Sequence, residues 1–150
     1  METMAIKKVV RKVKDLKRYE HNPRRNNDKA VNAVKESIKK FGFTNPIIIN
    51  QDNVILAGHT RLGALEALGI EKVDCIIVDG LTEEGEKAFR IADNRVGELS
   101  SWDKDLLEAE IKTINAEDWE NFGFKTRDLS FLEPPENCTC PKCGKIFQKV

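Results

Sequence analysis

The chain has 150 residues, of which 40% are hydrophobic and 33% are charged, and its formal net charge is zero. This length suits one compact domain with a short appendage. No apolar run approaches the ~20 residues that a membrane helix needs, and the first residues contain no apolar signal-peptide core, so we expect a cytoplasmic protein without a membrane partner.

The charge is unevenly distributed along the chain. Residues 1–30 hold ten Lys or Arg against four Asp or Glu, whereas residues 71–137 hold eight against eighteen. A basic beginning beside an acidic later part is compatible with a site for a polyanion such as DNA, and equally with a solvated surface on which charges segregate by chance. The zero net charge argues against a protein that holds DNA by charge alone.

The first third of the chain predicts three elements. In chain order they are a strand within the basic stretch 5–17, a polar loop over 18–27 and a helix over 28–41. The helix is predicted because apolar side chains recur on one face at helical spacing. Asn27 or Asp28 can cap its start, and Gly42 can end it.

The middle of the chain predicts a β-hairpin followed by alternating helices and a strand. The elements are strands at 46–50 and 54–56 around a turn at 51–53, a helix at 60–68, a strand from Lys72 to Val78, a helix opening at Thr82 and an acidic helix from Asp103 to Ile114. Cys75 lies in the apolar run of its strand, so we expect a buried thiol. Mixed strands and helices of this kind place the chain in the α/β (α+β) class.

The strongest local signal is the segment Gly58-His59-Thr60-Arg61, which joins a predicted strand directly to a predicted helix. Gly58 allows a sharp turn and a close approach of a ligand to the main chain, and the free N–H groups of the helix start suit an anion. Thr60 adds a hydroxyl, Arg61 a fork of donors that matches phosphate oxygens, and His59 a group that can move a proton. The alternative is an ordinary helix start with a polar cap and a solvated arginine.

Two further polar clusters are weaker. In the loop, Glu20 could be a base or a metal ligand and Arg24 a phosphate clamp, or both could be solvated. In the helix after Thr82, the segment 90–95 contains Asp93 and Asn94, although polar residues in helices are usually just exposed.

The end of the chain carries three clustered cysteines, Cys138, Cys140 and Cys143, of which the last two form a Cys-Pro-x-Cys-Gly knuckle. In a cytosolic chain such a cluster favours metal over disulfides, and the spacing suits Zn²⁺. A structural zinc needs a fourth ligand, which His21, His59, a second copy of the chain or a missing half-ribbon could supply. The alternative is a flexible tail with reduced thiols.

Taken together, residues 12–112 resemble the N-terminal domain of the ParB/sulfiredoxin superfamily. The resemblance rests on Asn22-Pro23-Arg24, Asn45-Pro46-Ile47, Ala57-Gly58-His59-Thr60-Arg61, Leu68-Gly69 and Ile91-Ala92-Asp93-Asn94 in this order. The match looks closest to the stand-alone or methyltransferase-fused ParB-like domains of phages and mobile elements.

The resemblance implies a small mixed sheet with helices and a nucleotide site. Its residues would be Asn22, Arg24, Asn45, Gly58, His59, Thr60, Arg61, Asp93 and Asn94. The ligand would be a nucleoside triphosphate with Mg²⁺, either CTP as in partitioning ParB proteins or ATP as in sulfiredoxins. His59 stands where sulfiredoxins carry their catalytic cysteine, which argues against sulfinic-acid reductase activity. Ala57 and Thr60 depart from the pattern of related serine kinases.

The sequence therefore predicts three regions: a ParB-like nucleotide-binding domain over 1–114, an extension and linker over 115–136, and a zinc-knuckle-like tail over 137–150. We expect the domain to act in the DNA metabolism of a phage or mobile element, with Glu20 or His59 as candidates for proton transfer. One alternative is an NTPase or small-molecule kinase that uses Glu20. Another is a DNA-binding or adaptor module that partners a DNA methyltransferase, or a second copy of itself, without nucleotide turnover.

Overall fold

The computed structural model describes residues 5–24, 27–114, 119–124, 137–139 and 146–148. The chain divides into two units, each described by itself below. The first is Met1–Ser101 with Asn121–Gly123, and the second is Trp102–Glu120 with Phe124–Val150. The three predicted regions, with their limits at residues 114 and 136, stay a prediction.

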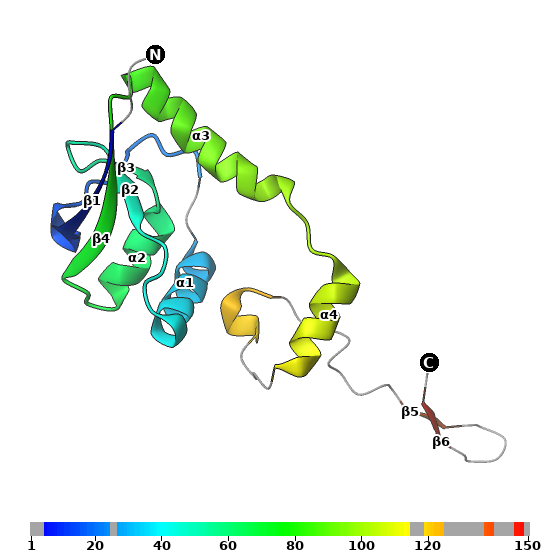
Figure 1. Cartoon of the computed structure of the whole chain (residues 1–150). Helices are drawn as coiled ribbons and strands as arrows, with labels where there is room; N and C mark the ends of the chain where they lie inside the picture. The colour runs from blue at the N-terminus through cyan, green and yellow to red at the C-terminus, as the bar shows by residue number, and fades with distance from the viewer. Residues whose placement is uncertain (1–4, 25–26, 115–118, 125–136, 140–145, 149–150) are drawn as a thin grey trace. The chain divides into compact units, whose positions relative to one another are not determined.

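The first unit is built on a four-stranded mixed sheet (Figure 1). Its strands are β1 (Ala5–Lys12), β2 (Ile47–Ile49), β3 (Ile55–Ala57) and β4 (Lys72–Asp79), in the spatial order β1-β4-β2-β3. The strand β4 pairs antiparallel with β1 and parallel with β2, and β2 pairs antiparallel with β3. The predicted hairpin and the predicted α+β class are therefore confirmed.

The turn of the hairpin is held by one side chain. Asn50 Oδ1 accepts hydrogen bonds from the backbone N–H groups of Asp52 at 3.0 Å and Val54 at 2.9 Å. Asn53 has a positive φ of 62°, a conformation that asparagine tolerates better than most residues. These contacts fix where β3 begins and so where it delivers the chain to Gly58.

Three helices accompany the sheet: α1 (Asp28–Phe41), α2 (His59–Ala67) and α3 (Glu83–Leu99), with a 3₁₀ turn η1 (Val13–Asp15) after β1. The side chain of Asn27 caps α1 by accepting from Ala30 N at 2.8 Å, and Gly42 follows it with φ of 80°. Thr82 caps α3 by accepting from Gly85 N at 3.1 Å. The predicted start and end of the first helix are confirmed, with Asn27 as the cap.

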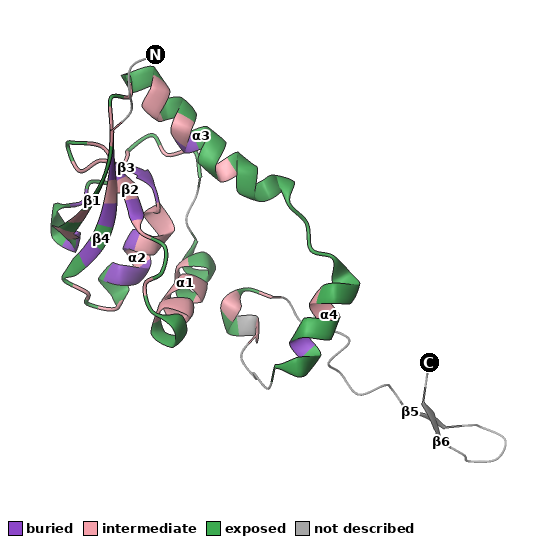
Figure 2. Cartoon of the chain, in the orientation of Figure 1, coloured by how far each residue is buried: buried purple, intermediate pink, exposed green. Residues whose placement is uncertain are grey.

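The core lies between the sheet and α2 (Figure 2). Its members are Val13, Leu16, Ile47, Ile49, Ile55, Leu62, Leu65, Val73, Cys75 and Ile77. The helix α1 packs against α2 at Gly63, where an added Cβ would lie 3.3 Å from Val31 Cγ2. Cys75 is 1% exposed, and its burial raises the thiol pKa to about 11, which confirms the predicted buried thiol.

The second unit contains α4 (Lys104–Thr113), capped by Asp103, and a two-stranded antiparallel pair of β5 (Asn137–Thr139) and β6 (Ile146–Gln148). In sequence, a 3₁₀ turn, η2 (Trp119–Phe122), lies between α4 and β5. Cys138 belongs to β5, whereas Cys140 and Cys143 lie outside the described residues, so the zinc knuckle stays a prediction. Among the described helices, none is long and apolar enough to cross a membrane.

Candidate functional site

The junction between β3 and α2 is shaped by Gly58. This residue has φ of 111° and ψ of 23°, and its carbonyl accepts the first hydrogen bond of the helix from Leu62 N at 2.9 Å. A positive φ is easily adopted only by glycine. An added Cβ would also lie 3.2 Å from Nε of Arg61, whose guanidinium folds back over the turn. The positive φ therefore favours glycine, and any larger residue here would also push the Arg61 guanidinium aside by a few tenths of an ångström.

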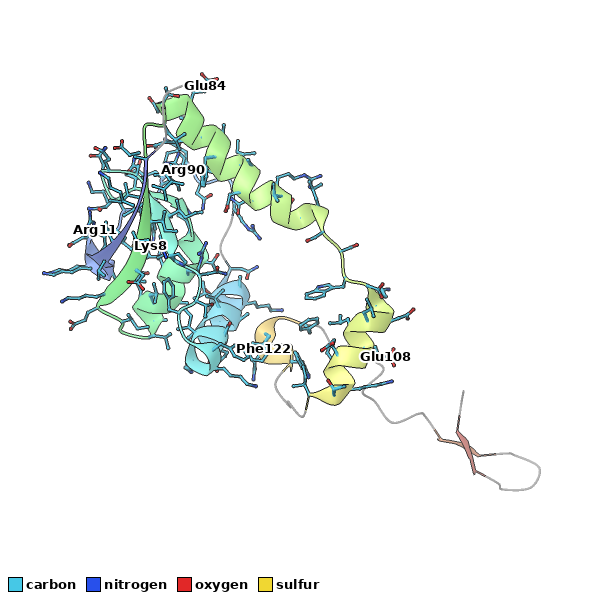
Figure 3. All side chains as sticks on the ribbon, in the orientation of Figure 1. Lys8, Arg11, Glu84, Arg90, Glu108 and Phe122 are labelled. Carbon is cyan, nitrogen blue, oxygen red and sulfur yellow. The ribbon has the colours of Figure 1, made fainter. Side chains whose placement is uncertain are left out.

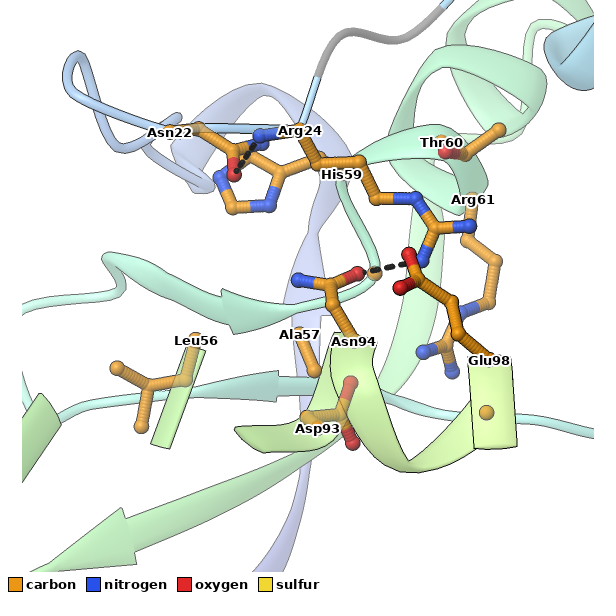
Figure 4. Close-up of a pocket in the computed structure, with 12 residues that line it drawn as sticks. Asn22, Arg24, Leu56, Ala57, His59, Thr60, Arg61, Asp93, Asn94 and Glu98 are labelled. Atoms are coloured by element: carbon orange, nitrogen blue, oxygen red, sulfur yellow. Dashed lines mark hydrogen bonds between the residues drawn. The ribbon is translucent and has the colours of Figure 1, made fainter. Parts of the chain in front are cut away.

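A cleft of about 330 Å³ opens beside this junction (Figure 4). Its walls come from the loop after β1, the end of β3, the first turn of α2 and the last turns of α3. The lining residues are Asn22, Arg24, Leu56, Ala57, Gly58, His59, Thr60, Arg61, Asp93, Asn94, Gly97 and Glu98. Every residue predicted to bind nucleotide lines this cleft, with the exception of Asn45.

The loop and α3 are joined across the cleft by a chain of hydrogen bonds. Arg24 Nη1 donates to Asn94 Oδ1 at 2.7 Å (Figure 4). Asn94 Nδ2 in turn donates to the carbonyl of Arg90 at 2.7 Å. Asn22 Oδ1 accepts from the backbone N–H of Arg24 at 3.3 Å and shapes the loop. Residues 70 positions apart in sequence thus meet at one side of the cleft.

A buried arginine anchors α3 at this place. Arg90 is 3% exposed, and its guanidinium carbon lies 3.9 Å from the centre of the Tyr19 ring. Its Nε donates to the Ile55 carbonyl at 3.2 Å, and its Nη2 forms an ion pair with Glu86 at 3.0 Å. Glu86 also accepts from Asn50 Nδ2 at 2.9 Å. Arg90 therefore ties three segments together: α3, β3 and the loop that carries Tyr19.

Sequence reasoning missed Arg90, because polar residues of this helix were expected to be exposed. That expectation is wrong for Arg90, which is buried with its charge compensated. The available signal was the spacing Glu86 to Arg90, since residues four apart on a helix are neighbours. The partner Tyr19 could not be found in this way, because it is distant in sequence.

His59 occupies the first position of α2, and its side chain is partly buried. Its Nε2 accepts a hydrogen bond from the Tyr19 backbone N–H at 3.3 Å. Burial, and then the charges of Arg18 and Arg90, lower its pKa to about 4. The imidazole is therefore neutral near pH 7, and because Nε2 is the acceptor, Nδ1 carries the hydrogen and is a donor. This state suits contact with an anion, while proton transfer by His59 stays a prediction.

Arg61 makes two contacts with the chain just before β2. Its Nη1 donates to the carbonyl of Asn45 at 3.0 Å and to that of Pro46 at 2.5 Å. Burial lowers the pKa of the guanidinium, and the negative charge of Asp93 opposes this effect. Asn45 thus contributes its backbone oxygen, and its predicted role as a nucleotide ligand stays a prediction.

Two residues alter the predicted composition of the site. Glu20 is exposed and does not belong to the lining of the cleft. Glu98, one helical turn after Asn94, does line it and forms an ion pair with Arg95 at 3.0 Å. Glu98 lies four residues after Asn94, so the two share one face of the helix, and this spacing was the signal that sequence reasoning missed. The cleft therefore combines the arginines 24 and 61 with two carboxylates, Asp93 and Glu98.

Comparison with known proteins shows which family the chain resembles. ParB-like nuclease domain-containing protein YnaK of Escherichia coli (strain K12) is 42% identical over 79 residues, which cover 53% of this chain and 91% of that protein.

Two solved structures have the same fold at 18% identity. The C-terminally truncated chromosome-partitioning protein ParB from Caulobacter crescentus, complexed with CTP-gamma-S, has a TM-score of 0.63 over 83% of this chain and 69% of that one. A Pnob8-like ParB-N domain has a TM-score of 0.53 over 97% of this chain and 58% of that one. The family model of the ParB N-terminal domain matches residues 2–95. The chain belongs to the ParB N-terminal domain family.

Proposed function

We propose that the cleft between Gly58 and α3 binds the phosphates of a nucleoside triphosphate, with CTP as the first candidate, in a domain that acts on DNA. The observation that carries this proposal is the left-handed Gly58 followed at once by the start of α2 at a wall of the cleft. In support, a ParB protein of the same fold has been solved with CTP-gamma-S. The chain spans 69% of that protein and 58% of the Pnob8-like one, so the activity of the whole proteins is itself a proposal here.

The physical basis is the electrostatics of a helix start. The first N–H groups of α2 have no acceptor within the helix, and the partial positive charge of a helix N-terminus stabilises an anion by about 0.3–1 kcal/mol, and more where water is excluded. His59, neutral and with a hydrogen on Nδ1, adds a donor without adding a charge. Thr60 adds a hydroxyl that lines the same cleft.

Arg24 is the cation best suited to contact a phosphate. Its guanidinium is exposed at the cleft and shares one hydrogen bond with the neutral Asn94. A phosphate oxygen is a stronger acceptor than an amide oxygen, since charge-assisted hydrogen bonds are roughly twice as strong as neutral ones. Arg24 would therefore release Asn94 and bind the phosphate. Loss of the Arg24–Asn94 hydrogen bond would couple nucleotide binding to the position of α3.

The residues also fit a magnesium ion that accompanies a triphosphate. Mg²⁺ is usually held by one or two carboxylates together with substrate phosphates and water. Asp93 and Glu98 are the carboxylates of the cleft lining. The positive charge of the metal would offset these two carboxylates, and the negative charge of the phosphates would offset the two arginines.

The proposal concerns nucleotide binding, and it does not include hydrolysis of the nucleotide. The exposed position of Glu20 outside the lining gives no support to an NTPase or kinase that uses it. A role in a phage or mobile element and a DNA methyltransferase as partner rest on the sequence resemblance, and we keep them as proposals.

A thermal-shift panel tests the proposal. The nucleotides are CTP, ATP, ADP and GTP, each with Mg²⁺, and the proteins are wild type, Arg24→Gln and Arg95→Gln. A ligand at about one hundred times its Kd stabilises the folded state by about 2.7 kcal/mol, which raises Tm by roughly 10 °C for a domain of about 100 residues. We expect this rise with one nucleotide, reduced in Arg24→Gln and kept in Arg95→Gln, which removes an exposed arginine from α3. No rise with any nucleotide would refute the proposal.

A further inference from the structure

The edge strand β1 carries an unusual concentration of positive charge. Its sequence, Ala-Ile-Lys-Lys-Val-Val-Arg-Lys, contains four cationic side chains and no acidic one. It forms one end of the sheet order, so its outer backbone edge pairs with no other strand of that sheet. The opposite edge strand, β3, is buried along its whole length. The charge therefore lies on the open edge of the sheet, where Figure 3 labels Lys8 and Arg11.

Five lysines on and around β1 form what we call the β1 basic surface. They are Lys7, Lys8, Lys12, Lys14 and, on the neighbouring strand, Lys72. All five are exposed, and within the described part of the chain none takes part in an ion pair. By contrast, four cations of the helices are each paired with a glutamate three or four residues away: Lys39, Lys87, Arg95 and Lys112.

Two of these lysines face each other directly. Lys12 is the register partner of Lys72 in the antiparallel pair of β1 and β4. Like charges in directly opposite positions destabilise a sheet. Nearby acids, Asp15, Glu71 and Asp74, form no ion pair with the β1 basic surface within the residues described. An external anion would reduce this repulsion between Lys12 and Lys72.

Lysines on edge strands also prevent unwanted pairing between sheets. This protective role needs no lysine beyond the strand, so it does not explain Lys14. Lys8, Lys12 and the register partner Lys72 share one face of the sheet, and Lys7 lies on the other face, because side chains alternate along a strand. A strand rises about 3.3 Å per residue, so residues 7 to 12 spread their cations over about 16 Å. A phosphodiester backbone presents charges at regular intervals over such a length.

We propose that the β1 basic surface binds the phosphate backbone of double-stranded DNA without sequence preference. Duplex is favoured over single strands because β1 and β4 contribute no aromatic side chain on which an unpaired base could stack. The surface is separate from the nucleotide cleft, since none of its lysines lines that cleft. The inference deepens the DNA part of the proposed function and adds a site to it.

The test is fluorescence anisotropy with a short labelled DNA duplex, measured without nucleotide from about 50 to 200 mM salt. The proteins are the full chain, the triple variant Lys7→Gln, Lys8→Gln, Lys12→Gln, and a control with the same loss of charge, Lys29→Gln, Lys35→Gln, Lys104→Gln. Five of the six positions are exposed and Lys35 is half-buried, and the melting temperatures of the variants check that the fold is kept. A single-stranded DNA of the same length is the second ligand.

We expect the full chain and the control to bind duplex in a salt-dependent way, and the β1 variant to bind at least tenfold more weakly. Since each phosphate contact contributes about 0.9 to the slope of log K against log salt, the loss of three contacts lowers the slope by about 2.7. The proposal is overturned if the full chain does not bind duplex at about 50 mM salt, if both triple variants lose affinity equally, or if single-stranded DNA binds more tightly. A nucleotide-dependent rise in Tm that persists in the β1 variant would leave the cleft proposal standing in each of these cases.

Discussion

Replacement of Arg90 by methionine tests how α3 is held at the cleft. The change keeps most of the side-chain volume and removes the guanidinium. It leaves the Glu86 carboxylate, whose side chain is 18% exposed, without its cation, and leaves the Ile55 carbonyl without its donor. It also removes the stacking of the guanidinium on Tyr19. Each loss falls on a group that water reaches poorly.

The expected cost follows from these contacts. Removing one partner of a fully buried ion pair costs about 3–5 kcal/mol. Glu86 keeps its hydrogen bond from Asn50 and some contact with water, which places Arg90→Met near the lower end, at about 3 kcal/mol. A small domain has a free energy of unfolding of about 5–15 kcal/mol, so this loss is a large part of the total.

The assay is urea unfolding followed by circular dichroism, with linear extrapolation to water. The matched control is Arg95→Met on the same helix, whose side chain is 64% exposed and whose ion pair with Glu98 lies at the surface, so that the control changes stability by less than about 0.5 kcal/mol. In the double variant Arg90→Met, Glu86→Leu, more than about 1 kcal/mol returns, because the unpaired carboxylate is gone. If Arg90→Met unfolds at the same urea concentration as wild type, the anchoring role of Arg90 is refuted.

Three further predictions concern a histidine and the cysteines. His59 has a folded pKa of about 4 against 6.5 unfolded, so the unfolded chain binds more protons between these values. The stability linked to His59 is at most about 3.4 kcal/mol at 1.36 kcal/mol per pKa unit; it is present above pH 6.5 and lost as the pH falls toward 4. Urea titrations at pH 7 and 4.5 should show a smaller decrease for His59→Gln than for wild type, and equal decreases would contradict the assignment. In a variant with the three tail cysteines changed to serine, the Cys75 thiol, with its raised pKa of about 11, should react with a disulfide reagent only after unfolding; rapid reaction in the native state would disprove its burial. Protein purified without chelator should contain zinc, lost when Cys140 and Cys143 become serine, whereas a metal content near zero in wild type would contradict the zinc tail.

Local signals in the sequence were sufficient for much of the first unit. The cap at Asn27, the stop at Gly42 and the hairpin around residues 51–53 depend on contacts within a few residues, and the structure contains all three. The same holds for Gly58, where a glycine between a predicted strand and a predicted helix indicated a sharp turn, which the structure forms with a positive φ. Contacts of this range are encoded in spacing and residue type.

Contacts between distant segments could not be predicted in the same way. The position of β4 between β1 and β2 follows from packing of the whole sheet, and no spacing in the sequence determines it. The pairing of Tyr19 with Arg90 and of Arg24 with Asn94 depends on that packing. The family resemblance did bring Arg24 and Asn94 into one site, because it carries information about spatial neighbours that periodicity lacks.

The central claim is that nucleotide phosphates bind at the turn formed by Gly58. The most direct measurement is a calorimetric titration of CTP with Mg²⁺ into wild type, Gly58→Ala and Gly69→Ala. Both glycines have positive φ, but an added Cβ meets Arg61 at residue 58 and meets nothing within 4 Å at residue 69, so the control replaces a positive-φ glycine without disturbing the cleft. We predict one site per chain in wild type and in Gly69→Ala, with affinity at least tenfold weaker in Gly58→Ala. Equal affinity in all three proteins would contradict the account.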